Sequence, residues 1–400
     1  MIVVGEASGD ELGAELVRDL RHVAPEIHIF GASGPKMRTE GVETILESDS
    51  WSVVGVAAVA GAIPKFLRIK NRLRKIAFAR KPEAVLLIDF PEFNLKLAKK
   101  LKADGHRVIY YVSPQVWAWR QYRYKTIRDS VDLLLSILPF EKSWYTNKQV
   151  EHVEFVGNPV ALRTRNLISR SEFCEKYGLS ASNEIIAILP GSRRKEIERH
   201  LETMLDAATD VKKSRPNSQF VIAASNDDNR KPCQSKVEDF ESGRSEKLKP
   251  FVVSDDTLNL LNAADVAAVS SGTATLEAGV IGTPMVVVYR VPQFDAAIFR
   301  PFIDVPHFAL INLISQKRLV TELVQNDFTS QNLSNELIRL LDPLTNQEMR
   351  KELLAVTKEF RNARTKTAAE AIVDFLDQNS KSGPTSDARP PIIPKISSNL

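Results

Sequence analysis

The sequence has few of the features that mark secreted, fibrous or disordered proteins. Its 400 residues include only two cysteines, Cys174 and Cys233, which lie too far apart in the chain to suggest a disulfide framework or a zinc site. This scarcity favours a reducing compartment, so we expect a cytoplasmic protein. With 17 glycines and 21 prolines the chain is too poor in both for a fibrous protein, and 43% hydrophobic residues is too many for a disordered one.

Long hydrophobic runs and a strong charge imbalance are also missing. The longest nearly uncharged apolar run, Val53–Pro64, is well short of the ~20 residues that span a bilayer. The first residues, Met1–Gly5, lack the charged and apolar regions of a secretory signal. We therefore expect a soluble chain without a targeting segment. The net charge of +4 does not indicate a nucleic-acid partner.

Short β-rich runs alternate with helical patterns along most of the chain, in two series. Apolar runs of this length, separated by amphipathic helices, predict an α/β fold with parallel sheets in two doubly wound, Rossmann-like domains. The expected strands are Met1–Val4, Ile27–Phe30, Ala84–Asp89, Arg107–Val112 and Val153–Val156, then Ile185–Leu189, Gln219–Ala223, Phe251–Val253, Val266–Val269 and Met285–Val288.

The polar stretch Leu162–Asn183 separates the two series and is interpreted as the linker. This places an N-terminal domain at residues 1–161 and a second domain at 184–345. Residues 346–378 have a helical period, and residues 379–400, with four prolines among serines, are expected to be a disordered tail. Ligands should bind in the cleft between the domains, beyond the carboxyl ends of the strands.

The first strand leads into Gly5-Glu6-Ala7-Ser8-Gly9-Asp10 and then into a helix expected from about Glu11. Gly5 and Gly9 could let the backbone approach a ligand, while Ser8 and Asp10 could cap the helix. The spacing G-x-x-x-G lacks the dinucleotide fingerprint. A tight turn without a ligand is an equally good interpretation of this segment.

Two later segments of the first series carry candidate chemistry. Asp89 ends a strong strand and is a candidate general base, although an N-cap for the next helix is the alternative. Trp117 and Trp119, followed by Arg120, could form an apolar wall beside a sugar or an acyl chain. Two tryptophans buried in the core remain the alternative. The run Leu138-Pro139-Phe140-Glu141 is typical of a turn into a helix.

Two strand-to-helix loops of the second series predict a nucleotide-diphosphate site. In the first loop Gly191, Ser192 and Arg193 open a long helix, where backbone N–H groups and a guanidinium suit a diphosphate. In the second loop Ser271, Gly272 and Thr273 begin another helix, and Glu277 on its first turns could accept hydrogen bonds from ribose hydroxyls, or simply face the helix dipole.

Motifs for a metal or a cofactor are not found. The sequence has no Walker A motif, no HExxH and no Asp-x-Asp pair for a metal-bound nucleotide sugar, so we expect neither a metal nor a cofactor.

The motifs GEASGD, IDFPEFN, YVSPQVWAWR, LPFEK, LPGSR and SSGTATLE, in this order, closely resemble the lipid-A-disaccharide synthase family over roughly residues 1–375. The resemblance implies an inverting glycosyltransferase of the GT-B type, with two Rossmann-like domains facing a central cleft. It implies transfer of 2,3-diacylglucosamine from its UDP donor onto 2,3-diacylglucosamine 1-phosphate, with release of UDP, in lipid A biosynthesis.

The resemblance also assigns roles to residues. It makes Asp89 the catalytic base, Arg193 an essential donor-site residue and Asn312 a functional residue near the cleft, and it places Ser271 to Glu277 against UDP. The motifs that hold Gly5, Glu6, Ser8, Gly9, Trp117 and Trp119 belong to the acceptor half. A homodimer is compatible with the resemblance, since C-terminal helices can be exchanged between subunits in this family. The proline-rich tail has no counterpart there.

A basic segment predicts contact with a membrane. Residues 65–81 carry eight basic side chains and no acidic one, with Phe66, Ile69, Leu73 and Ile76 at helical spacing. The alternative is a helix that packs on a sheet and exposes a solvated basic face. Because the implied substrates carry acyl chains, we expect peripheral association with the anionic inner-membrane surface.

Two other functions compete with a lipid-A-disaccharide synthase. One is a UDP-N-acetylglucosamine 2-epimerase or another GT-B transferase, which would share the fold and the nucleotide site but not YVSPQVWAWR. The other is a non-catalytic lipid-binding module, which would leave LPGSR and SGTATLE without a purpose.

Overall fold

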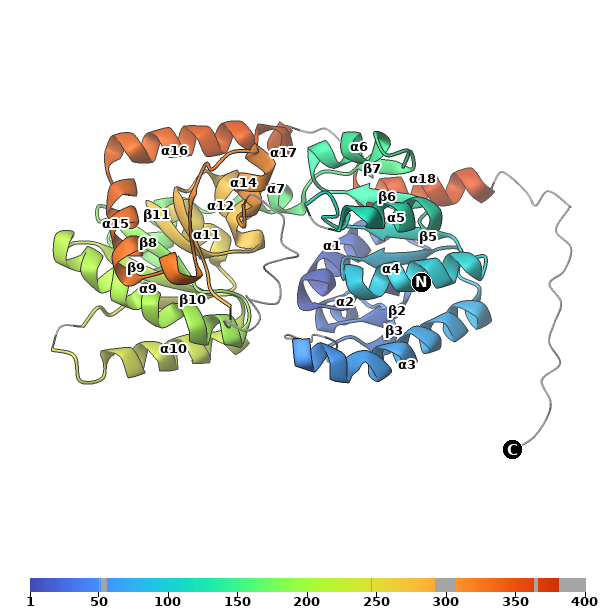
Figure 1. The fold of residues 1–400 in the computed structure, drawn as a ribbon, viewed down its shortest axis with the longest axis horizontal. Coiled ribbons are helices and arrows are strands. Elements are labelled where there is room, and N and C mark those ends of the chain that lie inside the picture. The colour runs from blue at the N-terminus through green and yellow to red at the C-terminus, as the bar shows by residue number, and fades with distance from the viewer. Residues whose placement is uncertain are drawn as a thin grey trace, which may run out of the picture.

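The computed structural model describes residues 1–49, 51, 56–118, 120–245, 247–291, 307–362 and 366–380. They form two parallel sheets, one from each half of the chain (Figure 1). The first sheet has the order β3-β2-β1-β4-β5-β6-β7. Its strands are β1 (Ile2–Val3), β2 (Phe30–Ser33), β3 (Glu43–Glu47), β4 (Val85–Ile88), β5 (Val108–Tyr111), β6 (Leu133–Ser136) and β7 (Val153–Phe155).

Helices connect the parallel strands of this first domain. They are α1 (Ala7–Val23), α2 (Pro35–Thr39), α3 (Val56–Arg80), α4 (Pro91–Ala103), α5 (Tyr124–Ser130), α6 (Pro139–Thr146) and α7 (Pro159–Arg163). The strand order reverses between β1 and β4, which is the point where such sheets open a crevice for ligands.

The second sheet repeats the architecture, with the order β10-β9-β8-β11-β12-β13. Its strands are β8 (Ile185–Leu189), β9 (Gln219–Ala224), β10 (Phe251–Ser254), β11 (Val266–Ser270), β12 (Met285–Tyr289) and β13 (Thr321–Val324). Here the order reverses between β8 and β11. The described helices of this half are α8 (Arg170–Tyr177), α9 (Arg194–Ser214), α10 (Asp227–Glu241), α11 (Thr257–Ala263), α12 (Thr273–Ile281), α14 (Leu310–Ser315), α15 (Ser330–Leu340), α16 (Pro343–Val356) and α17 (Lys358–Asn362).

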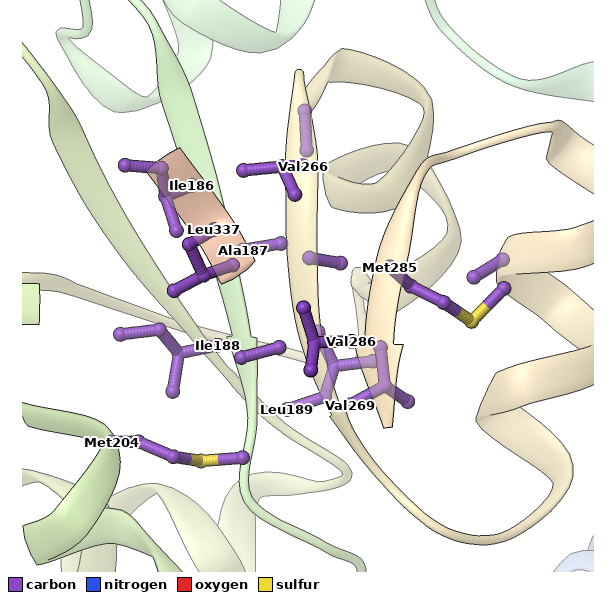
Figure 2. Close-up of a cluster of buried hydrophobic side chains, with 14 of the residues drawn as sticks. Ile186, Ala187, Ile188, Leu189, Met204, Val266, Val269, Met285, Val286 and Leu337 are labelled. Atoms are coloured by element: carbon purple, nitrogen blue, oxygen red, sulfur yellow. The ribbon is translucent and has the colours of Figure 1, made fainter. Parts of the chain in front are cut away.

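The core of the second domain follows from the uninterrupted apolar runs of its strands. All five residues of β8 and of β11 are buried, as expected for central strands covered on both faces. Figure 2 shows the β8 and β11 side chains in one cluster with Met204 of α9 and Leu337 of α15. The predicted linker segment contains α8, whose Phe173 and Cys174 also belong to this core.

The last helix, α18 (Ala368–Ser380), returns to the first domain (Figure 1). Its Ala369 and Ile372 are buried in the cluster that contains Val17 and Leu20 of α1. In this structure α18 therefore packs against the N-terminal domain of its own chain. The disordered tail was predicted at residues 379–400, but residues 379 and 380 still belong to α18, and residues 381–400 lie outside the described part of the chain.

Most predicted strands are confirmed, but one is displaced and three others were missed. The expected strand Ile27–Phe30 begins only at Phe30 and continues to Ser33. Three strands, β3, β6 and β13, were not predicted. β3 is an edge strand with no buried residue, which leaves little hydrophobic signal in the sequence. No helix of the described residues is long and apolar enough to cross a bilayer.

Candidate active site between the two sheets

The predicted site segments lie at the carboxyl ends of the central strands. GEASGD follows β1 and Asp89 follows β4, while the LPGSR loop follows β8 and the SSGTATLE loop follows β11. These four strands flank the two points where the strand order reverses. The fold therefore places the four motifs where doubly wound sheets bind ligands.

The GEASGD turn is built differently from the prediction. Helix α1 begins at Ala7 rather than near Glu11, and its N-cap is Glu6. Asp10 is buried inside α1 and does not cap it. Instead, the Asp10 carboxylate accepts hydrogen bonds from the Gly34, Lys36 and Met37 amides at 2.9, 2.8 and 3.1 Å, and so caps α2. The motif thus ties together the loops after β1 and β2.

The other small residues of this turn differ in their surroundings. A Cβ at Gly5 would come within 2.2 Å of the Phe90 ring, so this glycine admits an aromatic side chain beside Asp89. A Cβ at Gly9 would have ordinary contacts at 3.7 Å and beyond, and Ser8 is exposed. The Phe90 ring therefore accounts for the glycine at position 5 without a ligand.

Asp89 occupies a constrained backbone position at the end of β4. Its φ is +48°, in the left-handed region that residues other than glycine rarely adopt. The Asp89 carbonyl accepts hydrogen bonds from the Tyr110 hydroxyl at 2.6 Å and from Asn94 Nδ2 at 2.8 Å. The N-cap of α4 is Phe90, so the alternative interpretation of Asp89 as an N-cap is wrong.

The environment of the Asp89 carboxyl favours its protonated form. Burial, and next the negative charge of Glu6, raise the pKa of Asp89 to about 6, and a hydrogen bond from the Phe90 amide only partly offsets them. A carboxylate with a pKa near 6 is suited to accept a proton at neutral pH, because it is deprotonated yet more basic than an ordinary aspartate.

Trp117 is half-buried, so it is neither a fully buried core residue nor a fully exposed wall of a ligand site. Its indole Nε1 donates to Glu141 Oε1 at 3.1 Å, and its ring meets Phe140 edge-on with centroids 4.9 Å apart. The predicted turn into a helix is confirmed, since α6 begins at Pro139, and Glu141 in its first turn also accepts from the Leu138 amide at 3.2 Å. Burial raises the pKa of Glu141 to about 8, so its carboxyl is mostly protonated at neutral pH. Trp119 lies outside the described residues.

The backbone amides of the LPGSR loop bind the carboxylate of Glu196, which lies in the first turn of α9. The φ of Gly191 is +127°, and a Cβ there would come within 2.5 Å of Glu196 Oε2. This oxygen accepts from the amides of Ser192 and Arg193 at 3.1 and 3.3 Å, and Arg193 Nη1 donates to Glu196 Oε1 at 3.2 Å. An anionic ligand at these amides would have to replace the Glu196 carboxylate.

The SSGTATLE loop is open at its glycine. A Cβ on Gly272 would meet no atom within 4 Å, and Thr273 is exposed at the first position of α12. Ser271 Oγ donates to the Phe308 carbonyl at 3.0 Å. The loop thus presents exposed backbone beside a fixed serine, as the prediction of a phosphate-binding loop requires.

Glu277 takes part in a charged cluster with the first domain. Burial raises its pKa, while the positive charge of Arg163 lowers it and Glu11 raises it. Arg163 Nη1 donates to Glu11 Oε1 at 3.3 Å, and its Nε lies 3.6 Å from Glu15 Oε1. Glu277 of α12 and the acidic face of α1 therefore share one arginine.

Asn312 is fully buried, and protein groups occupy both ends of its amide. Its Nδ2 donates to the Val320 carbonyl at 2.9 Å and to Glu322 Oε1 at 2.8 Å, and its Oδ1 accepts from the Val320 amide at 2.9 Å. Glu322 in turn accepts from the amides of Phe308 and Ala309, both at 2.9 Å. Asn312 therefore fixes the backbone that receives the hydrogen bond of Ser271.

The two halves of the site meet at an ion pair across the cleft. Arg193 Nη2 of the second domain lies 3.6 Å from Glu6 Oε2 of the first, and Glu6 is the charge that raises the pKa of Asp89. The structure thus brings Arg193, Glu6 and Asp89 into one neighbourhood. Among the described residues, no group of three or more His, Cys, Asp or Glu side chains could hold a metal ion.

Several residues of this neighbourhood have no signal in the sequence. Glu196, Arg163 and the buried His200 carry no motif on which a prediction could rest. Each acts through partners distant in the chain or through a local loop conformation, which only the folded structure reveals.

Comparison with known proteins decides the family. The model of the lipid-A-disaccharide synthetase family matches residues 1–374. The lipid-A-disaccharide synthase of Myxococcus xanthus (strain DK1622) is 39% identical over 381 residues, covering 94% of this chain and 97% of the relative. That of Nitrosococcus oceani is 33% identical over 380 residues, covering 94% and 96%. The chain belongs to the lipid-A-disaccharide synthase family.

Solved structures agree on the fold. A UDP-N-acetylglucosamine 2-epimerase described as putative, from Listeria monocytogenes, has a TM-score of 0.60 at 14% identity, covering 98% of each chain. The calicheamicin glycosyltransferase CalG4 has a TM-score of 0.57 at 13% identity, covering 96% of this chain and 97% of that one. The predicted GT-B fold is therefore confirmed. Family membership makes this protein a glycosyltransferase that forms the lipid A disaccharide, and it decides against the epimerase and the non-catalytic module.

Proposed function

We propose that this lipid-A-disaccharide synthase transfers 2,3-diacylglucosamine from UDP to the 6-hydroxyl of 2,3-diacylglucosamine 1-phosphate, inverting the anomeric carbon from α to β. The ion pair of 3.6 Å between Arg193 and Glu6 is the observation that supports this proposal most directly. The arginine of the expected donor loop contacts Glu6 of the first domain, whose charge acts on the expected base, Asp89.

In this proposal the acceptor oxygen attacks the anomeric carbon while the bond from that carbon to the UDP oxygen breaks. Asp89 takes the proton of the attacking hydroxyl. The bonding electrons leave with UDP, whose diphosphate is stabilised by Arg193 and by the N-terminal ends of α9 and α12. Arg193 must then exchange Glu6 and Glu196 for the diphosphate, so its two carboxylate partners hold it in place until the donor arrives.

The roles of the remaining predicted residues follow from their positions. Ser192, Ser271, Gly272 and Thr273 would contact the diphosphate. Glu277 would face the ribose. Gly5, Glu6, Ser8, Gly9 and the two tryptophans, Trp117 and Trp119, would line the acceptor half. Asn312 would act at a distance, through Glu322 and Phe308, on Ser271.

The proposal is tested by a transfer assay with UDP-2,3-diacylglucosamine and 2,3-diacylglucosamine 1-phosphate. We expect UDP and a β-1,6-linked disaccharide 1-phosphate in equal amounts, with the linkage read from the anomeric NMR signals. Release of UDP without disaccharide, or an α linkage, would contradict the proposed reaction.

The acylated substrates also support docking of this protein on the anionic inner-membrane surface through α3. The predicted apolar stripe of this helix faces inward, since Leu73 is buried and Phe66 packs against Phe90 and Phe93. Leu67 and Phe78 are instead exposed, 48% and 73% respectively. The membrane-facing residues therefore differ from the stripe on which the prediction was based.

Basic side chains accompany this exposed apolar surface. Arg68, Arg72 and Lys75 are exposed on α3, and the Lys70 pKa is lowered first by burial and then by Lys100 and Lys96 of the neighbouring α4. We name the exposed α3 residues Leu67, Arg68, Arg72, Lys75 and Phe78 the α3 face. Apolar and basic residues together are what binding to an anionic bilayer surface requires.

A further inference from the structure

One fully buried histidine contacts three of the loops that surround the expected donor site. His200 lies on α9, and its Nδ1 is 2.9 Å from the Pro190 carbonyl and 3.3 Å from Ser270 Oγ. Its Nε2 is 3.2 Å from the Arg290 amide nitrogen. Pro190 immediately precedes the LPGSR glycine, Ser270 precedes Ser271, and Arg290 follows β12. One imidazole thus joins the ends of β8, β11 and β12.

The contacts define the tautomer of this imidazole. The Pro190 carbonyl can only accept, so at 2.9 Å it requires a proton on Nδ1. With that proton in place, the unprotonated Nε2 accepts the N–H of Arg290. The Arg290 carbonyl, also 3.2 Å from Nε2, already accepts from Arg199 Nη1 at 3.3 Å and does not need the histidine as a donor. Burial lowers the pKa of His200, which favours this neutral form.

We propose that His200 is a positioning residue of the donor site, which as the neutral Nδ1–H tautomer sets the LPGSR loop and the end of β11 at the spacing that the donor diphosphate requires. The inference rests on the proposed function, because it takes these two loops to be the diphosphate site. His200 is buried and acts through Pro190 and Ser270, so it does not touch the substrate itself.

The first test compares kinetic constants of His200→Leu with those of the parent. Leucine fills much of the same volume but leaves the Pro190 carbonyl and the Arg290 amide without this partner. We expect the KM for the UDP-sugar donor to rise on the order of tenfold, as expected for the loss of one or two hydrogen bonds, with little change in the KM for the acceptor. His200→Asn should recover most of the donor KM, because its Nδ2 can donate to Pro190 from the place of Nδ1.

Met204→Ala is the matched control. Met204 lies about one turn further along α9, is likewise buried and belongs to the apolar core. Its truncation should lower the melting temperature without changing the donor KM. An unchanged donor KM in His200→Leu would overturn the proposal, and so would equal changes of donor KM in His200→Leu and Met204→Ala. A parent without transferase activity would instead count against the proposed function.

A second measurement is made on the parent protein, and variants of the other histidines serve only to assign its signals. In protein labelled with ¹⁵N at histidine, the His200 signal, assigned by elimination with variants of the other histidines, should show a protonated Nδ1 and an unprotonated Nε2 at neutral pH. Addition of UDP should shift this signal. A protonated Nε2, or a signal indifferent to saturating UDP, would overturn the proposal.

Discussion

At the scale of single residues, the site depends on carboxyl groups whose surroundings alter their acidity. Burial raises the pKa of both Asp89 and Glu141, but their partners differ. Asp89 faces another carboxylate, Glu6, whereas Glu141 faces an indole N–H and a backbone amide. The negative charge of Glu6 adds to burial in raising the pKa of Asp89, whereas the two donors at Glu141 lower its pKa and only partly offset the effect of burial.

Replacing Asp89 with asparagine tests its role as the base. We expect Asp89→Asn to fold, because the hydrogen bonds that hold this residue involve its backbone carbonyl, which the substitution retains. The transfer rate should fall by about 10²–10⁴, the usual contribution of a general base. UDP affinity should stay near that of the parent, since Asp89 lies on the acceptor side. Turnover close to the parent rate in a folded Asp89→Asn protein would remove this residue from the reaction.

The pH dependence of transfer by the parent protein is a second test of Asp89 as the base. The active form is the deprotonated one, and the pKa of Asp89 is about 6, so kcat/KM should rise with pH up to about 6 and level off above it. An ordinary aspartate would give its inflection near pH 4. The profile should be measured with saturating acceptor, and an acid limb without an inflection between about pH 5 and 7 would contradict this assignment.

At the scale of elements, the start of α6 links stability to pH. The raised pKa of Glu141 means that the folded protein holds a proton that the unfolded chain releases above about pH 4.5. Its contribution is therefore fully present below the unfolded pKa and is lost as the pH rises through about 8. The slope is at most about 1.4 kcal/mol per pH unit for one proton.

We expect the melting temperature of the parent to fall between pH 6 and pH 9 by more than that of Glu141→Gln. Glutamine can still accept from Trp117 but does not titrate, and the loss of one oxygen at Leu138 should cost about 1–2 kcal/mol at pH 6. Parallel melting curves for the two proteins across this pH range would show that Glu141 is not protonated in the fold.

The α3 face gives a second prediction at this scale. Arg68 and Arg72 are exposed, whereas Arg74 donates to Asp104 at 2.6 and 2.7 Å and supports the fold. The double variant Arg68→Glu/Arg72→Glu should therefore lose sedimentation with anionic vesicles at low salt while keeping UDP binding. Each basic residue near such a surface contributes about 1 kcal/mol, and salt screens the effect.

The control for this prediction is Lys351→Glu/Lys358→Glu, which makes the same change of charge on α16 and α17. These helices lie on the second domain, away from α3 (Figure 1). The control should sediment like the parent. If both double variants lose binding equally, net charge rather than the α3 face governs association with the vesicles.

At the scale of the whole molecule, an apolar junction holds the two sheets together beside the charged site. It joins Leu138, Val160 and Ala161 to Leu276, Val280 and Phe360. The first two residues from the second half belong to α12, which carries the second donor loop at its N-terminus. Leu276 and Val280 therefore anchor the helix of the expected second donor loop to the first domain.

The proposed arrangement of the whole site leads to a prediction about the effect of chelators on the transfer rate. In the proposed mechanism, Arg193 and the N-terminal ends of α9 and α12 would supply the positive charge for the leaving diphosphate. We expect the transfer rate to be the same with and without EDTA. Complete loss of activity in EDTA, with recovery on addition of magnesium or manganese, would show that these groups are not sufficient.

The sequence alone determined the fold class and the placement of the candidate site segments after strands. Buried parallel strands are continuous apolar runs, so β8, β11 and β12 were visible without any partner. Asp89 directly follows such a strand and Arg193 lies in the loop after another, and the edge where parallel strands end is fixed by topology. Edge strand β3 and the loops around it lack this signal.

Only the tertiary structure decided what each side chain does. Asp10 was expected to cap its own helix but caps α2, because the chain folds the loop after β2 back over it. The side-chain amide of Asn312 forms its hydrogen bonds with protein groups, and the Glu196 carboxylate accepts from an amide of the preceding loop. His200 joins three strand ends that lie 10, 70 and 90 residues away. Burial and hydrogen-bond partners arise from contacts distant in the chain, whereas hydrophobic period is a local property that the sequence carries by itself.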